Sequence, residues 1–552
     1  MALATLYTKA ARSSLVPPNC HAFIIDHKAR PESAEEARWV AEQLRSKFDM
    51  ESTIIPLVWP KDLDPNDTTK FETAARKLRY RALGLACGRQ NVRMLMTAHH
   101  GDDVAETILM RLILKRWRSG LQGMFPVQWI PECHGVHGVH HSGGLKKAEL
   151  QEQSKIALPF PIEQGGIQLL RPLLAFEKSR LIATCEDNGT PWVEDKTNHD
   201  RTLTARNACR HIMKHHRLPS ALSQPSLVTI AHNMQARVGD VKAKAEKLFD
   251  NCPLELNIQT GSLIVRLPRV DSLLNRPITT ESDRNEARNI AYSLLARLTD
   301  LVSPQESTIV TRFARIVGFI YPSLSSTGTE DAHNQSIPYF NLNSVWFRPL
   351  LHGKPLDRTK SPQYHEGDWL FSRQPFQFLE HSAVSITIPP LSSSEGSRDP
   401  QWHLFDGRFW IRIHNHTPSP LILRPFKHAD LETLAAETKA NPDKTAYHSR
   451  VIKAAIARIK PADLRLGLPV IAQVNPDGED NILTLPTLYP SGSILPDIHW
   501  ELRYKKVDMG SRALHEVVAV GIREPSRTEL GSDEDEDGGE QTVDQVAGGA
   551  GR

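Results

Sequence analysis

The sequence predicts an α/β protein that begins with a parallel sheet covered by helices. Over the first 125 residues, short apolar runs alternate with amphipathic helical stretches, and this alternation favours parallel strands joined by helical crossovers. Histidines and carboxylates cluster directly after the third run, at the edge where such sheets bind ligands. Beyond residue 220 the pattern changes to a helical segment and then to a mixed α+β region.

Three apolar runs predict strands of the first sheet, at residues 22–27, 53–59 and 93–98. Each is short and consists mainly of aliphatic residues, which is typical of a strand buried on both faces. Residues that directly follow these runs are candidate site residues, because ligands bind beyond the carboxyl ends of parallel strands.

Two amphipathic helices are expected between these strands. Ser33 stands three residues before Glu36, a spacing typical of a capping box, so we expect Ser33 to cap a helix that continues to residue 48. The next helix spans about residues 70–88 and carries an apolar stripe that predicts its buried face. This stripe comprises Phe71, Ala75, Leu78, Ala82 and Leu85.

Composition excludes several classes of protein. Of 552 residues, 40% are hydrophobic and 24% are charged, as in an ordinary globular protein. No run of about 18 apolar residues occurs, so no membrane span is expected. Six cysteines are scattered without a CxxC pair, which argues against a disulfide scaffold and favours a reducing compartment. The net charge is only +3, so any nucleic-acid surface must be local.

The predicted organisation has a first domain at residues 1–220, interrupted by a His-rich insert at 127–166. A helical region at 221–321 follows, then a mixed α+β region at 337–510. The acidic, Gly-rich tail at 525–552 is expected to be disordered.

The insert allows two interpretations. Within nine residues it holds Cys133, His134, His137, His140 and His141, a set of ligand types that could bind zinc. The glycines between them, and the lack of a second ligand cluster, favour a flexible loop instead.

The most informative stretch is TAHHGDDVAETILMRL, residues 97–112. Asp102 can cap a helix that starts here, and Asp103 and Glu106 are three apart, so they share one face. That face lies beside His99 and His100 at the end of a strand. Carboxylates there can hold Mg²⁺ on a nucleotide, or an ammonium group. The alternatives are acidic residues that only favour the positive helix end, ordinary loop histidines, or a metal cluster.

The stretch AHHGDDVAETILMRL resembles the second signature of tRNA(Ile)-lysidine synthases, which belong to the PP-loop ATP-pyrophosphatase family. Five further stretches resemble this family in the same order, so the resemblance covers about residues 1–215. They are DHKARPESAEEA, FETAARKLRYRAL, RSGLQGM, LLRPLLAFEKSRL and GTPWVEDKTNHDRTLTARNACRH. Residues 405–413 and 464–488 resemble, more loosely, the C-terminal part of fungal-type members.

The resemblance implies a ligase that forms a carbon–nitrogen bond. Such enzymes adenylate the wobble cytidine of tRNA(Ile) with a CAU anticodon, and free L-lysine then displaces AMP to give lysidine. ATP and Mg²⁺ are the implied cofactors, a homodimer is compatible with the resemblance, and no membrane partner is expected. A mitochondrial location is expected from the bacterial type of this system, with a cytoplasmic location as the alternative.

The resemblance also assigns roles to residues. The implied catalytic residues are His99, Asp103, Glu106, Arg79 and Arg171, and Asp103 is also the implied contact of Mg²⁺ through ATP. The implied cofactor-binding residues are Asp26, His27, His100 and Asp102. The implied tRNA contacts are Lys178, Arg206, Asn207 and Arg210. Without the resemblance, the basic helix that carries Arg79 would fit a solvated helix surface equally well. For the four tRNA contacts, charges on a helix surface stay an equal alternative even with the resemblance. Residues 201–217 contain no Asp or Glu, which favours phosphate contacts there.

The SGGxDS sequence of the family's phosphate loop does not occur in the chain. Residues 1–16 have the composition of a transit peptide, but MALATLY resembles the helix that follows this loop, with a buried face of Ala2, Leu3, Leu6 and Ala10. The printed chain is therefore expected to lack the first strand and the loop, to bind ATP poorly and to be inactive. A truncated gene model or a true loss of ATP chemistry would both explain this.

Two other functions remain open. A non-catalytic tRNA-binding homologue would keep the fold without the chemistry. A PP-loop tRNA thiolase would share the adenylation step, but thiolases of this type usually carry CxxC pairs for sulfur or iron–sulfur chemistry, and this chain has none.

Overall fold

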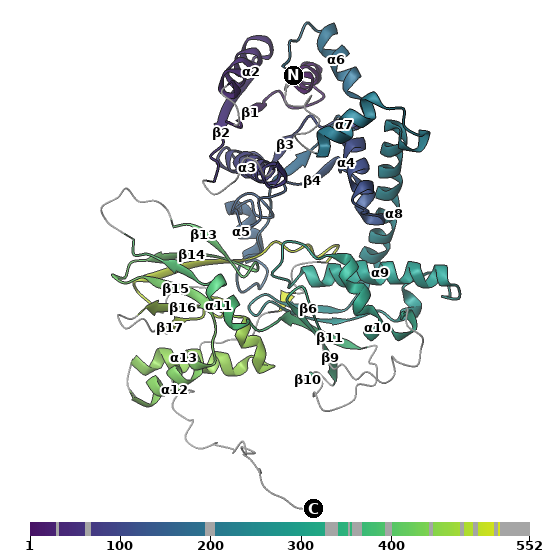
Figure 1. Ribbon diagram of the computed structural model, residues 1–552. Helices are drawn as coiled ribbons and strands as arrows, with labels where there is room; N and C mark the ends of the chain where they lie inside the picture. The colour runs from purple at the N-terminus through teal and green to yellow at the C-terminus, as the bar shows by residue number, and fades with distance from the viewer. Residues whose placement is uncertain are drawn as a thin grey trace, which may run out of the picture.

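The computed structural model describes residues 1–28, 32–60, 68–193, 205–325, 340–351, 354–355, 367–391, 400–440, 445–474, 480–489, 495–512 and 517–518. Figure 1 shows an N-terminal α/β part above a C-terminal part built on several sheets, with the long helix α8 (Gln224–Asn251) running from one to the other. None of the described helices has the length and hydrophobicity that a membrane span requires.

The N-terminal part contains two small sheets. Strands β1 (His21–Asp26) and β2 (Glu51–Pro56) pair in parallel. Strand β5 (Gln168–Leu170) pairs in parallel with β3 (Met94–Met96) and antiparallel to β4 (Val127–Trp129). No pairing between described residues joins the two sheets. The predicted α/β class with parallel strands is confirmed.

Helices surround these sheets, at α1 (Ala2–Arg12), α2 (Ser33–Phe48), α3 (Thr68–Arg89), α4 (Gly101–Ile113), α6 (Lys178–Asp187) and α7 (Ala205–His215). The predicted first helix forms, but Thr5 is its buried residue. The cap of α2 is Glu32 rather than Ser33. The Ser33 hydroxyl donates instead to the Asp26 carboxylate at the end of β1, so it ties the helix to the strand.

The buried face of α3 also differs from the predicted stripe. Tyr80, Leu83 and Cys87 are buried, whereas Leu85 is exposed. Gly84 lies between them, where an added Cβ would come within 2.7 Å of Val139 Cγ1 and 2.9 Å of Cys133 Sγ. The His-rich insert therefore covers this face of α3.

The insert is a packed element, which corrects the expectation of a flexible loop. It contains β4 and α5 (Lys147–Ser154), and Ile130, Cys133 and Val139 belong to a buried cluster with the α3 residues. The Cys133 thiol donates to the Tyr80 carbonyl at 3.3 Å. No group of three or more metal-ligating side chains occurs among the residues that the structure describes.

The C-terminal part is built on three sheets. The largest has the order β10-β9-β11-β7-β6-β19, with β8 paired to β9. Its strands are β6 (Leu254–Asn257), β7 (Ser262–Arg266), β8 (Phe340–Leu342), β9 (Val345–Leu351), β10 (Lys354–Pro355), β11 (Asp368–Arg373) and β19 (Val517–Val518). The second sheet is β12 (Ile386–Ile388), β15 (Leu421–Pro425), β16 (Pro469–Val474) and β17 (Asp480–Thr484). The third is β13 (Trp402–Phe405), β14 (Phe409–Asn415) and β18 (Ile498–Tyr504).

The helices of this part are α9 (Glu281–Asp300), α10 (Val317–Ile320), α11 (Phe378–Val384), α12 (Ala429–Ala440) and α13 (Thr445–Arg458). The segment 221–321 is not purely helical, because it includes the hairpin β6–β7, which turns at Gly261 with φ of 64°. Strand β7 pairs with β11, so one sheet crosses the predicted border between the helical and the mixed regions.

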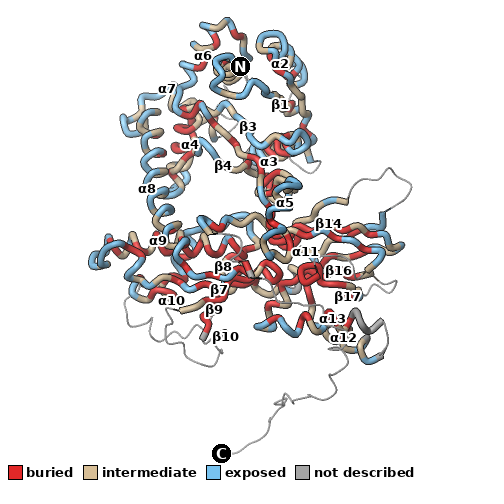
Figure 2. The backbone as a smooth tube through the Cα atoms, turned by 180° about the vertical axis from the view of Figure 1, so that it is seen from behind, coloured by how far each residue is buried: buried red, intermediate tan, exposed pale blue. Residues whose placement is uncertain are grey.

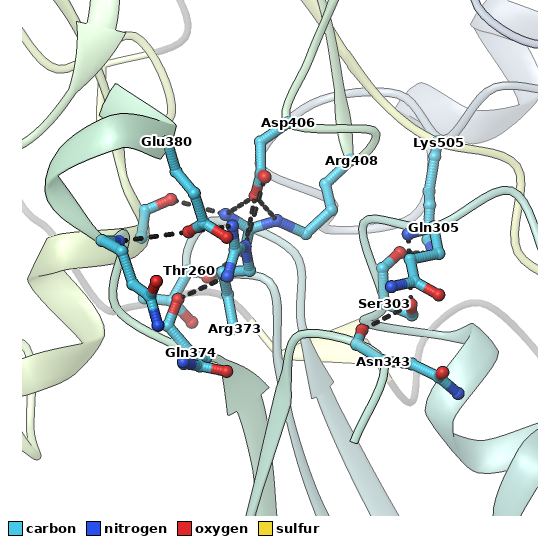
Figure 3. Close-up of polar contacts among 12 residues, drawn as sticks. Thr260, Ser303, Gln305, Asn343, Arg373, Gln374, Glu380, Asp406, Arg408 and Lys505 are labelled. Atoms are coloured by element: carbon cyan, nitrogen blue, oxygen red, sulfur yellow. Dashed lines mark hydrogen bonds and ion pairs between the residues drawn. The ribbon is translucent and has the colours of Figure 1, made fainter. Parts of the chain in front are cut away.

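One large apolar core holds the C-terminal part together, and Figure 2 shows its buried residues along the strands. A polar network lies inside it (Figure 3). Arg408 is fully buried and donates to the Asp406 carboxylate at 2.8 Å and to the Gly467 carbonyl at 2.6 Å. Arg373 donates to the same carboxylate at 3.2 Å, so both buried guanidiniums are paired.

The insert also packs against the C-terminal part. The His137 ring stacks on Trp402 at 4.8 Å and meets Trp410 edge-on at 5.0 Å. The Glu163 carboxylate accepts hydrogen bonds from the Gly143 and Gly144 amides and from Arg503. The insert thus connects α3 of the first part with the third sheet of the second.

Candidate functional site

The site begins where β3 ends and α4 starts. His100 has extended backbone angles and is the N-cap of α4, and its amide donates to the Asp103 carboxylate at 3.0 Å. Asp102, which we expected to be the cap, lies inside the first turn. Its carboxylate instead accepts the Lys178 amide at 2.8 Å, which fixes α6 beside α4. The His100 ring lies 3.5 Å from each of these two carboxylates.

His99 lies among opposite charges at the same strand end. Burial lowers its pKa to about 4; Asp103 opposes this shift, and the positive charges of Arg171, Arg79 and Arg206 add to it. The ring is therefore neutral at neutral pH. The structure therefore brings together four of the residues predicted to be catalytic. They are His99, Asp103, Arg79 and Arg171, and the predicted tRNA contact Arg206 is close to them.

Glu106 joins helix α7 to α4. It is 3% exposed, and Arg210 donates to both of its oxygens, at 2.7 and 3.0 Å. Arg206 lies 3.5 Å from the same carboxylate and donates to the Thr107 hydroxyl at 3.3 Å. Burial raises the pKa of Glu106, and the hydrogen bonds from Arg210 oppose that rise. The site is thus held together by an ion pair between two helices.

Arg171 and Arg79 reach the site from different elements. Arg171 follows β5, is buried, and donates to the Phe125 carbonyl at 2.8 Å. Burial lowers the pKa of both arginines. The Tyr80 ring lies 5.2 Å from the Arg79 guanidinium, and we had not predicted a role for this residue. The sequence could have indicated this contact, because Tyr80 follows Arg79 directly and lies four residues after Arg76 on the same helix.

Asp26 and His27 lie at the end of the neighbouring strand β1. The buried Asp26 carboxylate accepts the Lys28 amide at 3.0 Å and the Ser33 hydroxyl, and these bonds lower its pKa. The His27 carbonyl accepts the Trp59 indole N–H at 2.7 Å. These contacts are local to the first sheet and α2.

The predicted tRNA contacts have different environments. The side chains of Arg206 and Arg210 are about one third exposed, so they can face solvent and Glu106 together. Asn207 is buried. Lys178 is exposed at the start of α6, next to Asp102. The roles of these residues stay predictions.

The carboxylates of Asp102 and Asp103 could supply some, but not all, of the oxygen ligands that Mg²⁺ requires. Each uses its Oδ2 atom for the contacts above, and neither Oδ1 has a hydrogen bond or ion pair within the described part of the chain. Two carboxylate oxygens are too few for an octahedral ion, but Mg²⁺ is commonly held by one or two carboxylates together with phosphates and water. The residues therefore fit a nucleotide-bound Mg²⁺ better than a protein-only site.

Comparison with known proteins adds independent evidence. Residues 1–217 match the family described as PP-loop domain. A probable tRNA(Ile)-lysidine synthase of Schizosaccharomyces pombe is 28% identical over 475 residues, 84% of each chain. A tRNA(Ile)-lysidine synthase of Methylobacterium nodulans is 31% identical over 41% of this chain and 54% of its own. One of Wolbachia pipientis is 26% identical over 54% of this chain and 57% of its own.

A solved structure, the U34-tRNA thiolase NcsA from Methanococcus maripaludis with its [4Fe-4S] cluster, also matches. It is 12% identical, covers 43% of this chain and 67% of its own, and has a TM-score of 0.27, which is too low to infer a shared arrangement. The family match and the named relatives agree with each other. Residues 1–217 are similar to the PP-loop domain family, and the relatives reported above are named tRNA(Ile)-lysidine synthase.

Proposed function

We propose that the protein is a tRNA(Ile)-lysidine ligase, which adenylates the wobble cytidine of tRNA(Ile) and replaces the leaving AMP with the ε-amine of free lysine. The observation that carries the proposal is the neutral, half-buried His99 at the end of β3, with Asp103 and three arginines close enough to affect its charge. Such a site offers positive charge for phosphates, a carboxylate for an ammonium group and an imidazole for proton transfer.

Each residue type has a physical task in this reaction. Arg79, Arg171 and Arg206 would stabilise the negative charge that develops on the leaving phosphate. Asp103 would hold the lysine ammonium close to the reacting base. That ammonium must lose a proton before it can attack, and His99 is the neutral group beside it. Bound phosphates would offset the positive charges that lower the pKa of His99, and would so make it a stronger base.

The charge on α7 supports an RNA substrate. Arg206 and Arg210 face Glu106 but remain partly exposed, and the same helix ends with Lys214 and His215. Contacts of cations with phosphates supply affinity for RNA without base specificity. Selection of one tRNA would then depend on the shape and the unpaired bases of its anticodon loop.

The test compares the chain as printed, which contains no SGGxDS sequence, with the same chain preceded by the strand and SGGxDS loop of a relative. Each is supplied with tRNA(Ile) carrying a CAU anticodon, ATP, Mg²⁺ and labelled lysine. It measures tRNA binding, pyrophosphate release and label retained in the tRNA as three separate readouts. Label in the tRNA that requires ATP supports the proposal. His99→Asn should abolish labelling and keep tRNA binding, whereas His232→Asn, at an exposed position of α8, should change neither.

Binding of tRNA without pyrophosphate release, also when the SGGxDS loop is supplied, would contradict the ligase proposal and support a non-catalytic tRNA-binding protein. Pyrophosphate release without lysine transfer, followed by transfer of sulfur from a sulfide donor, would indicate the thiolase alternative. No binding of tRNA would contradict all three.

A further inference from the structure

The segment after α4 exposes an aromatic ring among positive charges. Residues 113–119 are all exposed, and they contain no Asp or Glu. Trp117 is 61% exposed and lies between Arg116 and Arg118, with Lys115 two residues before it. We call Lys115, Arg116, Trp117 and Arg118 the Trp117 platform. Ile113 and Leu114, which precede it, are also exposed, at 61% and 59%, and large apolar side chains that are exposed together often mark a binding surface.

The charges of the platform are not neutralised by the protein. In the ranges that the structure describes, Lys115, Arg116 and Arg118 form no ion pair, and the Trp117 ring makes no ring or cation contact. Arg116 also lies close to another cation, since burial and the positive charge of Arg116 both lower the pKa of Arg111. The platform therefore presents positive charge to a partner.

Hydrogen bonds and apolar packing of the neighbouring residues hold the backbone of the platform in place. Arg111 donates to the Gly120 carbonyl at 2.7 Å, and the Arg116 amide donates to the Arg111 carbonyl at 2.8 Å. Leu121 is buried between α4 and α8. Lys115 and Arg118 both have φ of 54°, a left-handed conformation that costs free energy for residues with a side chain. The fold thus maintains a strained turn that exposes Trp117.

We propose that the Trp117 platform binds single-stranded RNA, with one unpaired base stacked on the indole of Trp117 and the adjacent phosphates paired with the three cations. Aromatic rings next to cations are how proteins hold unpaired nucleotides. This inference rests on the proposed function, because that function makes RNA the substrate. It adds a binding site outside the catalytic residues.

Helix α4 sets the distance between the two sites. Asp103 and Glu106 lie in its first two turns, and the platform follows its last residue, Ile113. At 1.5 Å per residue, Glu106 and the end of the helix at Ile113 are separated by about 10 Å along the helix axis. The platform could therefore hold an unpaired nucleotide of the same RNA whose target base occupies the catalytic site.

The test measures the affinity of the full chain for a labelled single-stranded oligoribonucleotide by fluorescence anisotropy, without ATP or lysine. Trp117→Ala should weaken binding by roughly tenfold to a hundredfold, as expected for the loss of one stacked base. Trp117→Phe keeps a ring and should lose much less. Leu114→Ala is the matched control, because Leu114 is a neighbouring apolar side chain with 59% exposure and no ring.

The phosphate contacts have a separate readout. Arg116→Gln should reduce the slope of log affinity against log salt by about 0.7, the contribution of one phosphate contact to a single strand. The same RNA annealed into a duplex should bind with equal affinity to the wild type and to Trp117→Ala, because no base is free to stack.

Two results would overturn the inference. If the wild-type protein binds RNA and Trp117→Ala binds it equally well, the platform is not an RNA site, while the proposed function stands. If Leu114→Ala weakens RNA binding as much as Trp117→Ala, the effect comes from the exposed apolar surface and not from a base stacked on the indole, and the inference fails. Failure of lysine transfer with the Trp117→Ala effect intact would count against the proposed function only.

Discussion

Arg210 donates two hydrogen bonds to Glu106, at 2.7 and 3.0 Å, although the two residues are 104 positions apart in the chain. This ion pair joins α7 to α4 beside the apolar contact of Cys209 with the buried face of α4, and it brings the basic helix to the carboxylates of the site. Removal of this ion pair should therefore affect both the stability of the protein and the position of α7 relative to α4.

Arg210→Ala should lower the free energy of unfolding by about 1–3 kcal/mol, because Glu106 would stay buried without its closest partner. Arg206→Ala is the control, since Arg206 lies farther from the carboxylate at 3.5 Å, and it should cost less. Urea unfolding measures both. In the double variant Glu106→Gln/Arg210→Ala, the two costs should not add, because each single change removes the same interaction. Strictly additive costs would contradict the pairing.

Arg79→Met should raise the pKa of His99 above about 4. The positive charge of Arg79 is one of the influences that lower this pKa, and the charge is lost while the side chain keeps its approximate length. NMR titration of histidine ring signals, assigned with a His99→Gln variant, measures the shift. Arg76→Met is the control, since Arg76 pairs with Glu132 of the insert. An unchanged His99 signal in Arg79→Met would contradict the charge cluster.

The stability of the protein should fall with acidification because of His137. Burial, together with Arg503 and Arg412, lowers the pKa of this ring to about 3, below the value of about 6.5 in an unfolded chain. The unfolded state then binds more protons than the folded state between these values. The contribution of His137 is therefore complete above pH 6.5 and is lost as the pH falls towards 3. By pH 4 the loss amounts to at most about 3 kcal/mol.

Urea unfolding at pH 7 and pH 4.5 measures this dependence. His137→Gln should reduce the difference between the two pH values, and His232→Gln on the exposed face of α8 should leave it unchanged. An equal pH dependence in His137→Gln and wild type would assign the acid sensitivity to other groups.

Gly84→Ala should destabilise the protein by about 1–3 kcal/mol, because the new Cβ would clash with the buried Val139 and Cys133 side chains. Gly239→Ala tests the same substitution in another helix, where no atom lies within 4 Å of the new Cβ. It should stabilise by about 0.5–1 kcal/mol through helix propensity. Thermal melting distinguishes the two, and a stable Gly84→Ala protein would argue against close contact of the insert with α3.

The sequence was informative where local pattern and structure coincide. The strands at β1, β2 and β3 and the start of the site after β3 could be predicted, because buried strands and helix-start residues have local signatures. The residues His99, Asp103 and Glu106 also follow from spacing within one segment. Their encounter with Arg79, Arg171 and Arg206 could be expected only from the family resemblance, since these arginines come from three other elements.

The insert shows what local pattern could not reveal. Its glycines and histidines favour a loop, and the sequence predicts the stripe through Leu85 as the buried face of α3. The stripe through Tyr80 and Cys87 is buried instead because the insert packs there, a contact between segments about 50 residues apart. Likewise, the sequence places β7 in a helical region, because the strand that pairs with it, β11, comes about 100 residues later in the chain.

The anchoring of the insert has a consequence for how the protein is made. Glu163 accepts a hydrogen bond from Arg503, 340 positions later in the chain, and the His137 ring stacks on Trp402 and meets Trp410 edge-on. During synthesis the ribosome releases these partners long after the first 220 residues have emerged, and domains ordinarily fold in the order of their synthesis. The N-terminal part therefore emerges with its insert held by α3, and the contacts of the insert with the third sheet form when almost the whole polypeptide has been translated.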